Sequence, residues 1–208
     1  MTPAQQPRVY IVDDDAAVRA SLRALLGSVG LPAVDFASGE AFLQAVDGGT
    51  RGCLLLDVRM PGMSGLQLQQ ELRDRGIHIP VIVITGHADV PMAVRAMKAG
   101  AKDFMEKPFN HQQLLDRIQG CLEADAQSYS EERRRRETGA VLARLTAREL
   151  EVLKLLVTGR SSKTIAAACG ISEKTVDAHR ANVTKKTGAR SIAELVRLWL
   201  LVHPPGHA

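Results

Sequence analysis

Along the first 124 residues, segments with the hydrophobic pattern of a β-strand alternate with segments that have the pattern of an α-helix. Short apolar runs recur, and several have apolar side chains at both odd and even positions, as strands covered on both faces do. Between them, apolar residues recur at steps of three and four, the spacing of one helix face. We therefore expect strands at 9–12, 33–36, 53–56, 81–84 and 103–105, and helices around 18–29, 39–46, 65–73, 90–99 and 114–122.

This alternation predicts the fold class of the front half. Parallel neighbours in a sheet need a crossover, usually a helix, so five strand and helix pairs indicate a parallel sheet. We expect an α/β fold: a doubly wound, five-stranded parallel sheet with helices on both faces. In such sheets, ligands bind beyond the carboxyl ends of the strands, where the strand order reverses.

The back half, from residue 143, has helical periods and no strand pattern. Thr146 and Glu149 form a capping box that opens a first helix, and Gly159 ends it. A second helix precedes a turn at Gly170, Ser172 caps a third, and a fourth is expected at 191–201. This half should be a small all-α domain of four helices.

The second and third of these helices have helix-turn-helix spacing. Ala166 is small where the helices cross, Gly170 allows the turn, and Val176 seats the second helix. The third helix carries several cations, and an α-helix fits the DNA major groove. Any capped amphipathic bundle shows part of this pattern, so the hypothesis depends on the other features of the chain as well.

A polar segment separates the two halves. Glu131 and Arg135, Glu132 and Arg136, and Arg133 and Glu137 have the helical spacing of ion pairs, so the preceding helix should continue as a solvated linker, with a break expected at Gly139. The predicted domains are residues 1–124, a charged linker at 125–142, and a helical domain at 143–208.

Charge and composition narrow the class of protein. Residues 1–124 carry 12 Lys and Arg against 14 Asp and Glu, whereas residues 125–208 carry 15 against 9, so the back half is suited to a polyanion. No apolar stretch approaches a membrane span, and the N-terminus lacks a secretory signal, which predicts a cytoplasmic protein without membrane contact. The cysteines, Cys53, Cys121 and Cys169, lack metal-type spacing and are expected to be reduced packing residues rather than zinc ligands.

Polar residues follow the predicted strands of the front half at one edge of the sheet. Asp13, Asp14 and Asp15 follow the first strand and Asp57 the third, while Thr85 and Lys107 follow the fourth and fifth. Gathered carboxylates repel one another unless a cation neutralises them, and Mg²⁺ suits a site that also receives phosphate oxygens. Asp57 can then accept a phosphoryl group, with Lys107 and Thr85 beside its oxygens. Alone, an Asp at a strand end is more often a turn former or helix cap, and Asp15 is read as a cap.

The segments IVDDD, LLLDVRMPGMSG, VIVITGHADVPMAVRAMKAGAKDF and EKPF resemble the flavodoxin-like receiver domain of two-component response regulators, closest to the FixJ-type branch, over about residues 7–124. The resemblance implies that Asp57 is the phosphoacceptor. It also implies that Asp13, Asp14 and the backbone carbonyl of Arg59 hold Mg²⁺ with Asp57. Thr85 would be the switch hydroxyl, Phe104 the switch aromatic and Lys107 the phosphate clamp.

The segment from LTAREL to AELV resembles the LuxR/NarL-type output domain, over about residues 141–202. By that resemblance some residues would contact phosphates and others would read bases. Asp177 stands where relatives carry a basic or longer residue, and Ala178 and Ala181 are short, so base reading should depend mainly on Arg180 and Asp177. The implied DNA-binding residues are Lys163, Lys174, Thr175, Asp177, Ala178, His179, Arg180, Ala181 and Lys185.

Together these features predict a phosphorylation-activated transcription factor rather than an enzyme. A sensor histidine kinase would phosphorylate Asp57, and the chain would then form a homodimer on promoter DNA and contact RNA polymerase. One alternative is an aspartyl-phosphate-forming hydrolase, although residue 59 is Arg where such enzymes need an acid. Another is a ligand-sensing LuxR-type regulator without phosphorylation, although an aromatic content of 3% is low for a ligand pocket.

Overall fold

A computed structural model describes residues 6–86 and 90–204 of the chain. The chain divides into two compact units, Met1–Ser128 and Tyr129–Ala208. The boundary falls within a single helix, α5 (His111–Leu142). It also lies inside the segment 125–142 that the sequence marks as a linker. We describe each unit by itself.

The N-terminal unit contains a five-stranded parallel sheet with the order β2-β1-β3-β4-β5. The central strands β3 and β4 are buried along their whole length, which explains their unbroken apolar sequences. The predicted fold class is confirmed, and each predicted strand lies within one residue of its observed bounds. The strands are β1 (Arg8–Val12), β2 (Ala33–Phe36), β3 (Gly52–Leu56), β4 (Val81–Thr85) and β5 (Asp103–Glu106).

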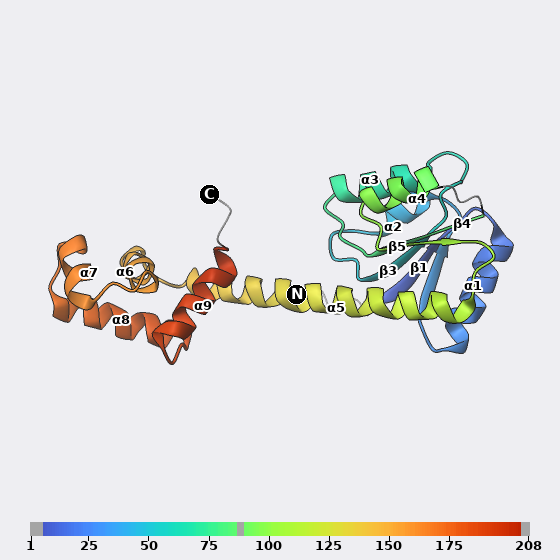
Figure 1. Cartoon of the computed structure of the whole chain (residues 1–208). Helices are drawn as coiled ribbons and strands as arrows, with labels where there is room; N and C mark the ends of the chain where they lie inside the picture. Colours follow the sequence, from blue (N-terminus) through green and yellow to red (C-terminus); the bar gives the residue numbers. More distant parts are fainter. Residues whose placement is uncertain (1–5, 87–89, 205–208) are drawn as a thin grey trace. The chain divides into compact units, whose positions relative to one another are not determined.

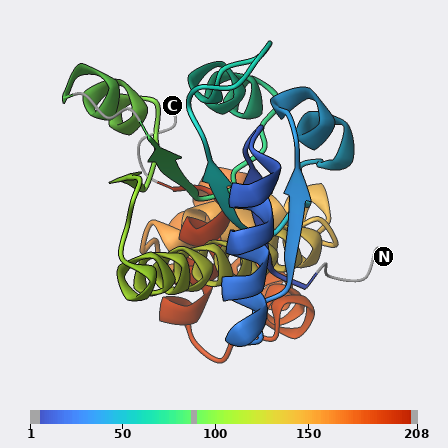
Figure 2. The same ribbon diagram turned by 90° about the vertical axis from the view of Figure 1, so that its right-hand side faces the viewer.

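Helices cover both faces of this sheet (Figure 1). One face packs against α2 (Gly39–Ala45), α3 (Gly65–Asp74) and α4 (Val90–Lys98), through a core that includes Phe42, Leu68 and Met92. The other face packs against α1 (Ala16–Ser28) and the first part of α5, and Figure 2 shows these two helices on the same side of the strands. The sheet is therefore doubly wound.

The strand order determines where a site can form. The chain passes from β1 to β2 on one side and reaches β3 on the other, so the order reverses between β1 and β3. The backbone N–H of Asp57 donates to the carbonyl of Val12 at 2.9 Å, which places the residues after both strands next to each other. This is the crevice that an open parallel sheet offers to ligands.

The C-terminal unit is helical over the residues that the structure describes. Its helices after α5 are α6 (Ala147–Val157), α7 (Ser162–Cys169), α8 (Glu173–Thr187) and α9 (Ile192–Val202). Thr146 and Glu149 form the predicted capping box of α6, and Ser172 caps α8. Gly170 ends α7 at a positive φ of 65°, a conformation that glycine adopts readily.

Two small cores hold the helices of this unit together. The first joins α6, α7 and α8 around Ile165, Ala166 and Val176, the positions that the helix-turn-helix spacing singled out. The second joins α6, α8 and α9 to Leu142, in the last turn of α5. Because that turn is packed in a core, α5 continues through Gly139, and the break expected there is wrong.

In the described segments, 6–86 and 90–204, no helix has both the length and the apolar character to cross a membrane.

Candidate functional site

Asp13, Asp57 and Lys107 meet beyond the carboxyl ends of β1, β3 and β5. The Lys107 ammonium lies 2.6 Å from Asp13 Oδ2 and 3.1 Å from Asp57 Oδ1. Asp13 is 3% exposed and Asp57 is 7% exposed, so two carboxylates are buried beside one ammonium. Three residues separated by up to 94 positions in the chain thus share one small volume.

Main-chain hydrogen bonds orient both carboxylates. Asp57 Oδ2 accepts a hydrogen bond of 2.7 Å from the backbone N–H of Arg59, and Asp13 Oδ1 accepts one of 2.9 Å from the backbone N–H of Asp15. In each acid, one oxygen is therefore held by the backbone while the other faces Lys107. The turn after each strand positions the side chain at the strand end.

Burial and charge act against each other in this cluster. Burial raises the pKa of Asp57 above its ordinary value, and the nearby Asp13 raises it further, while the charge and hydrogen bond of Lys107 lower it. Burial by itself would lower the pKa of Lys107, but its bonds to Asp13 and Asp57 raise it. The acids outnumber the cation, so the cluster favours further positive charge.

The other residues predicted for this site lie around the cluster. Thr85 is the last residue of β4 and is 1% exposed, and its carbonyl accepts a hydrogen bond from the Lys107 backbone N–H at 2.8 Å. Phe104 lies in β5, half-buried, and packs against the core under α2, α3 and α4. Asp14 is exposed, and Asp15 caps α1 by accepting from Ala17 N, as the sequence indicated.

Gly65, the first residue of α3, lies directly against the phosphoacceptor candidate. Its N–H donates to the carbonyl of Val58 at 3.0 Å, so the loop after β3 closes back on its own start. A Cβ at this position would overlap the carbonyl oxygen of Asp57. Only glycine allows α3 to begin so close to Asp57.

The donor chemistry of this cluster fits Mg²⁺. Magnesium takes oxygen ligands, needs only one or two protein carboxylates and keeps several waters. Asp13 and Asp57 supply two buried carboxylates that a single ammonium does not fully neutralise. Within residues 6–86 and 90–204, no three acidic, His or Cys side chains are grouped for a metal, and Asp14 is exposed.

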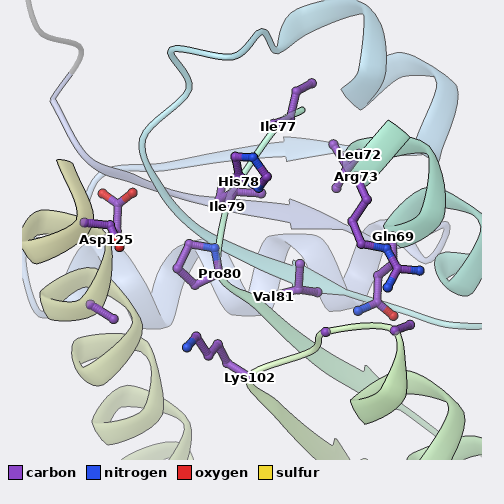
Figure 3. A pocket seen from close by; sticks show the side chains of 14 residues that line it. Gln69, Leu72, Arg73, Ile77, His78, Ile79, Pro80, Val81, Lys102 and Asp125 are labelled. Atoms are coloured by element: carbon purple, nitrogen blue, oxygen red, sulfur yellow. The ribbon is translucent and has the colours of Figure 1, made fainter. Parts of the chain in front are cut away.

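A separate hollow of about 340 Å³ lies near the start of β4 and β5, at the opposite ends of the strands (Figure 3). Gln69 of α3 and Asp125 of α5 lie on opposite sides of Pro80 in this view. Gln69 is 3% exposed, and its Oε1 has no hydrogen-bond partner among the described residues. None of the residues predicted for function lines this hollow.

In the C-terminal unit, the predicted DNA-binding residues occupy α7 and α8. Lys163 lies near the start of α7, and the others lie along α8 with their side chains exposed or half-buried. Val176 and Val183 are buried and hold α8 against the bundle. The helix therefore presents a polar surface that includes the other eight predicted residues, Lys174, Thr175, Asp177, Ala178, His179, Arg180, Ala181 and Lys185.

Family models match both units. The model described as the response regulator receiver domain matches residues 9–119, and the model for bacterial regulatory proteins of the luxR family matches residues 143–199. The transcriptional regulatory protein FixJ of Azorhizobium caulinodans is 50% identical to this chain over 93% of its length and 92% of the relative. This chain is a two-component response regulator.

Other relatives agree with this assignment. The response regulator protein TodT of Pseudomonas putida is 45% identical over 91% of this chain and 84% of the relative. The solved structure of the response regulator StyR matches with a TM-score of 0.85 and 44% identity, over 94% of this chain and 98% of that one. Full-length FixJ from B. japonicum matches with a TM-score of 0.58 and 40% identity, over 96% and 98%.

The domain content of the response regulator implies its classes of partner. A receiver domain receives its signal from a histidine kinase, and a LuxR-type domain binds promoter DNA. These two classes match the partners expected from the sequence.

Two ion pairs of this response regulator that contain a buried carboxylate were not predicted. Lys186, one of the cations of α8, lies 2.6 Å from the buried carboxylate of Glu149 in the capping box of α6. Arg51 pairs with Asp125 of α5 at 2.6 Å, with both side chains almost fully buried. The predicted capping box already included Glu149, one partner of the first pair. No local sequence pattern indicates either partner of the second pair.

Proposed function

We propose that Asp57 is the phosphoacceptor of this response regulator. The observation that carries the proposal is the Lys107 ammonium shared between the Asp57 and Asp13 carboxylates. An incoming phosphoryl group brings negative charge, and Lys107 lies close enough to interact with its oxygens. An Asp57 oxygen would attack phosphorus in line as the bond from phosphorus to the histidine nitrogen of the kinase breaks, and the histidine would leave with the bonding electrons. Thr85, at the end of β4, would supply a hydroxyl to the same oxygens.

In this proposal, Asp13, Asp14, Asp57 and the backbone carbonyl of Arg59 hold Mg²⁺. When bound, the ion neutralises the acids and the transferred phosphoryl oxygens. Asp13 and Asp57 are buried beside Lys107, whereas exposed Asp14 would approach through a change of its side-chain conformation. The excess of two buried carboxylates over one ammonium supports this assignment, because a second cation would favour the ionised form of both acids.

Phosphorylation is proposed to act through Thr85 and Phe104. Movement of the Thr85 hydroxyl toward the phosphoryl group would open space for the half-buried Phe104 ring, and so change the surface of α4 and β5. Helix α4 exposes Val90, Val94 and Met97, with Val90 77% exposed. Exposed apolar side chains on one short helix support a homodimer interface there.

The proposed output is binding of α8 in the major groove of promoter DNA. Lys163, Lys174, Thr175, His179 and Lys185 would contact phosphates, while Asp177, Ala178, Arg180 and Ala181 would face base edges. A dimer would present two such helices to two half-sites, and the bound regulator would contact RNA polymerase in the cytoplasm. In this scheme the chain is a regulator whose only chemistry is its own phosphorylation and dephosphorylation.

The test is phosphorylation of the full chain by acetyl phosphate with and without Mg²⁺, followed by intact mass and peptide mapping. The wild type should gain one acid-labile phosphoryl group at Asp57 only when Mg²⁺ is present. Asp57→Asn should gain none, and the matched control Asp116→Asn, an exposed acid on α5, should behave as the wild type. Label retained by Asp57→Asn would disprove the assignment.

Dimerisation has its own readout. Sedimentation of the phosphorylated wild type should show a mass shift toward the dimer, and Val94→Asp should prevent that shift without preventing phosphorylation. A control on another surface, Val29→Asp, changes an exposed apolar residue at the end of α1 and should leave dimerisation intact. An unchanged mass distribution of phosphorylated wild type would contradict this step.

A further inference from the structure

Ser162, which no motif marked, connects α7 to the base-facing side of α8. Its hydroxyl donates to Asp177 Oδ1 at 2.9 Å and accepts from Arg180 Nη1 at 2.6 Å. Asp177 and Arg180 are also near each other directly, with 3.7 Å between Arg180 Nη1 and Asp177 Oδ1. The three side chains form one network between the first turn of α7 and the first two turns of α8.

The network fixes the direction of each group. A serine hydroxyl has one hydrogen to donate, and here Asp177 receives it, so the lone pairs of the oxygen are left to accept from Arg180. The guanidinium has five N–H donors, and the contact with Ser162 uses one of its terminal nitrogens. The remaining donors keep the planar fork geometry that fits the O6 and N7 atoms of guanine.

The same network restrains the acid. Asp177 is 63% exposed at its side chain, and a carboxylate on a DNA-facing surface is repelled by phosphates unless a cation or donor faces it. Ser162 and Arg180 provide both a donor and a cation on one side of the carboxylate. Its other oxygen can still accept from a base donor, such as the N4 amino group of cytosine.

We propose that Ser162 is a specificity-positioning residue, which sets the geometry of Asp177 and Arg180 so that α8 selects a guanine and a neighbouring cytosine in each half-site. This inference rests on the proposed binding of α8 in the major groove. Ser162 itself touches no base. It acts by holding Arg180 in the orientation for a bidentate contact with a base.

A purely structural role for Ser162 predicts something different. The contact between α7 and α8 already has a buried core, including Ile165, Ala166 and Val176. Loss of one half-exposed hydroxyl should therefore leave the fold of the unit intact. Sequence preference, rather than stability, is the property that separates the two roles.

The experiment is selection from random double-stranded DNA by the full chain treated with acetyl phosphate, comparing the wild type with Ser162→Ala, Ser162→Thr, Asp177→Ala and Arg180→Ala. The wild type should enrich guanine and cytosine at adjacent positions, and Arg180→Ala should lose the guanine preference. Ser162→Ala should reduce that preference about tenfold, within the range expected for one bidentate contact. Ser162→Thr, which keeps the hydroxyl, should restore it.

Three further measurements distinguish a change in base preference from a change in folding or in phosphate contacts. Melting temperature, affinity for unrelated DNA and the salt dependence of binding should be the same for Ser162→Ala and wild type, because phosphate contacts are kept. Thr158→Ala removes a hydroxyl whose hydrogen bond is local to α6, and it should leave the selected sequence unchanged.

The outcomes separate the two levels of the proposal. If Arg180→Ala changes the selected sequence and Ser162→Ala does not, the role of Ser162 is wrong while DNA reading by α8 stands. If Asp177→Ala and Arg180→Ala both select the wild-type sequence, neither side chain reads a base, and the role of Ser162 fails together with the assignment of these two residues as base readers. A fall in melting temperature for Ser162→Ala that Ser162→Thr does not restore would assign Ser162 to structure and overturn the inference.

Discussion

Arg51 and Asp125 form a buried ion pair that joins the start of β3 to α5. Arg51 Nε and Nη2 lie 2.9 and 2.6 Å from Asp125 Oδ2, and Nη2 also donates to the Asp125 carbonyl at 3.1 Å. The side chains are only 10% and 5% exposed. The pair therefore anchors α5 a few residues before it leaves the N-terminal unit at Ser128.

Replacement of one partner of this pair should destabilise the N-terminal unit strongly. Arg51→Met leaves the Asp125 carboxylate buried without its cation, which typically costs about 3 to 5 kcal/mol. The double variant Arg51→Met/Asp125→Leu removes both charges and should recover most of that loss. Urea unfolding of the three proteins measures the difference, and equal stability of single and double variants would contradict the account.

Gly65→Ala should disturb the proposed phosphoacceptor, Asp57, without changing any polar side chain. The added methyl group overlaps the Asp57 carbonyl, so the loop after β3 has to move, at a typical cost of about 1 to 3 kcal/mol. We expect lower stability and slower phosphorylation by acetyl phosphate. Gly27→Ala is the control, because its Cβ meets no atom within 4 Å and alanine favours the helix α1.

Gln69→Met should stabilise the N-terminal unit. A buried acceptor without a hydrogen-bond partner costs about 1 to 3 kcal/mol, and methionine fills a similar volume without that acceptor. We expect a gain of about 1 kcal/mol in the free energy of unfolding. Gln113→Met, at an exposed position of α5, should change it little, and a loss of stability in Gln69→Met would show that the amide is satisfied in solution.

Acid should weaken the C-terminal unit through Glu149. The hydrogen bond from Lys186 and that from the Thr146 backbone lower the pKa of Glu149 from 4.5 to about 2. Because the folded pKa lies below the ordinary one, the stabilisation is complete above about pH 4.5 and is lost as the pH falls toward 2. Melting of wild type against Glu149→Gln across this range measures it, since the variant lacks this group and its stability should fall less.

The sequence allowed prediction of the sheet and of the residues at its rim because both follow from local rules. Strand runs and helix stripes are local patterns, and parallel topology then brings Asp13, Asp57 and Lys107 to one edge. In the structure the Lys107 ammonium lies 2.6 Å from the Asp13 carboxylate and 3.1 Å from the Asp57 carboxylate. The capping box at Thr146 and Glu149 is likewise a local signal that the structure contains.

Local sequence patterns could not predict contacts between side chains that are far apart in the chain. Arg51 and Asp125 lie 74 positions apart, and nothing in either neighbourhood marks a partner. Ser162 reads as an ordinary first-turn serine until the packing of α7 on α8 brings it to Arg180. The helix break predicted at Gly139 was wrong for a related reason. The low helix propensity of glycine is outweighed by the packing of Leu142 in the next turn.

Helix α5 has 32 residues and contributes Leu114 and Ile118 to the core of one unit and Leu142 to a core of the other. A fusion of this receiver to a foreign reporter domain should therefore have its junction in the solvated middle of α5, after Asp125 and before the turn that contains Leu142. A cut at either end would remove an anchor from the part that is kept.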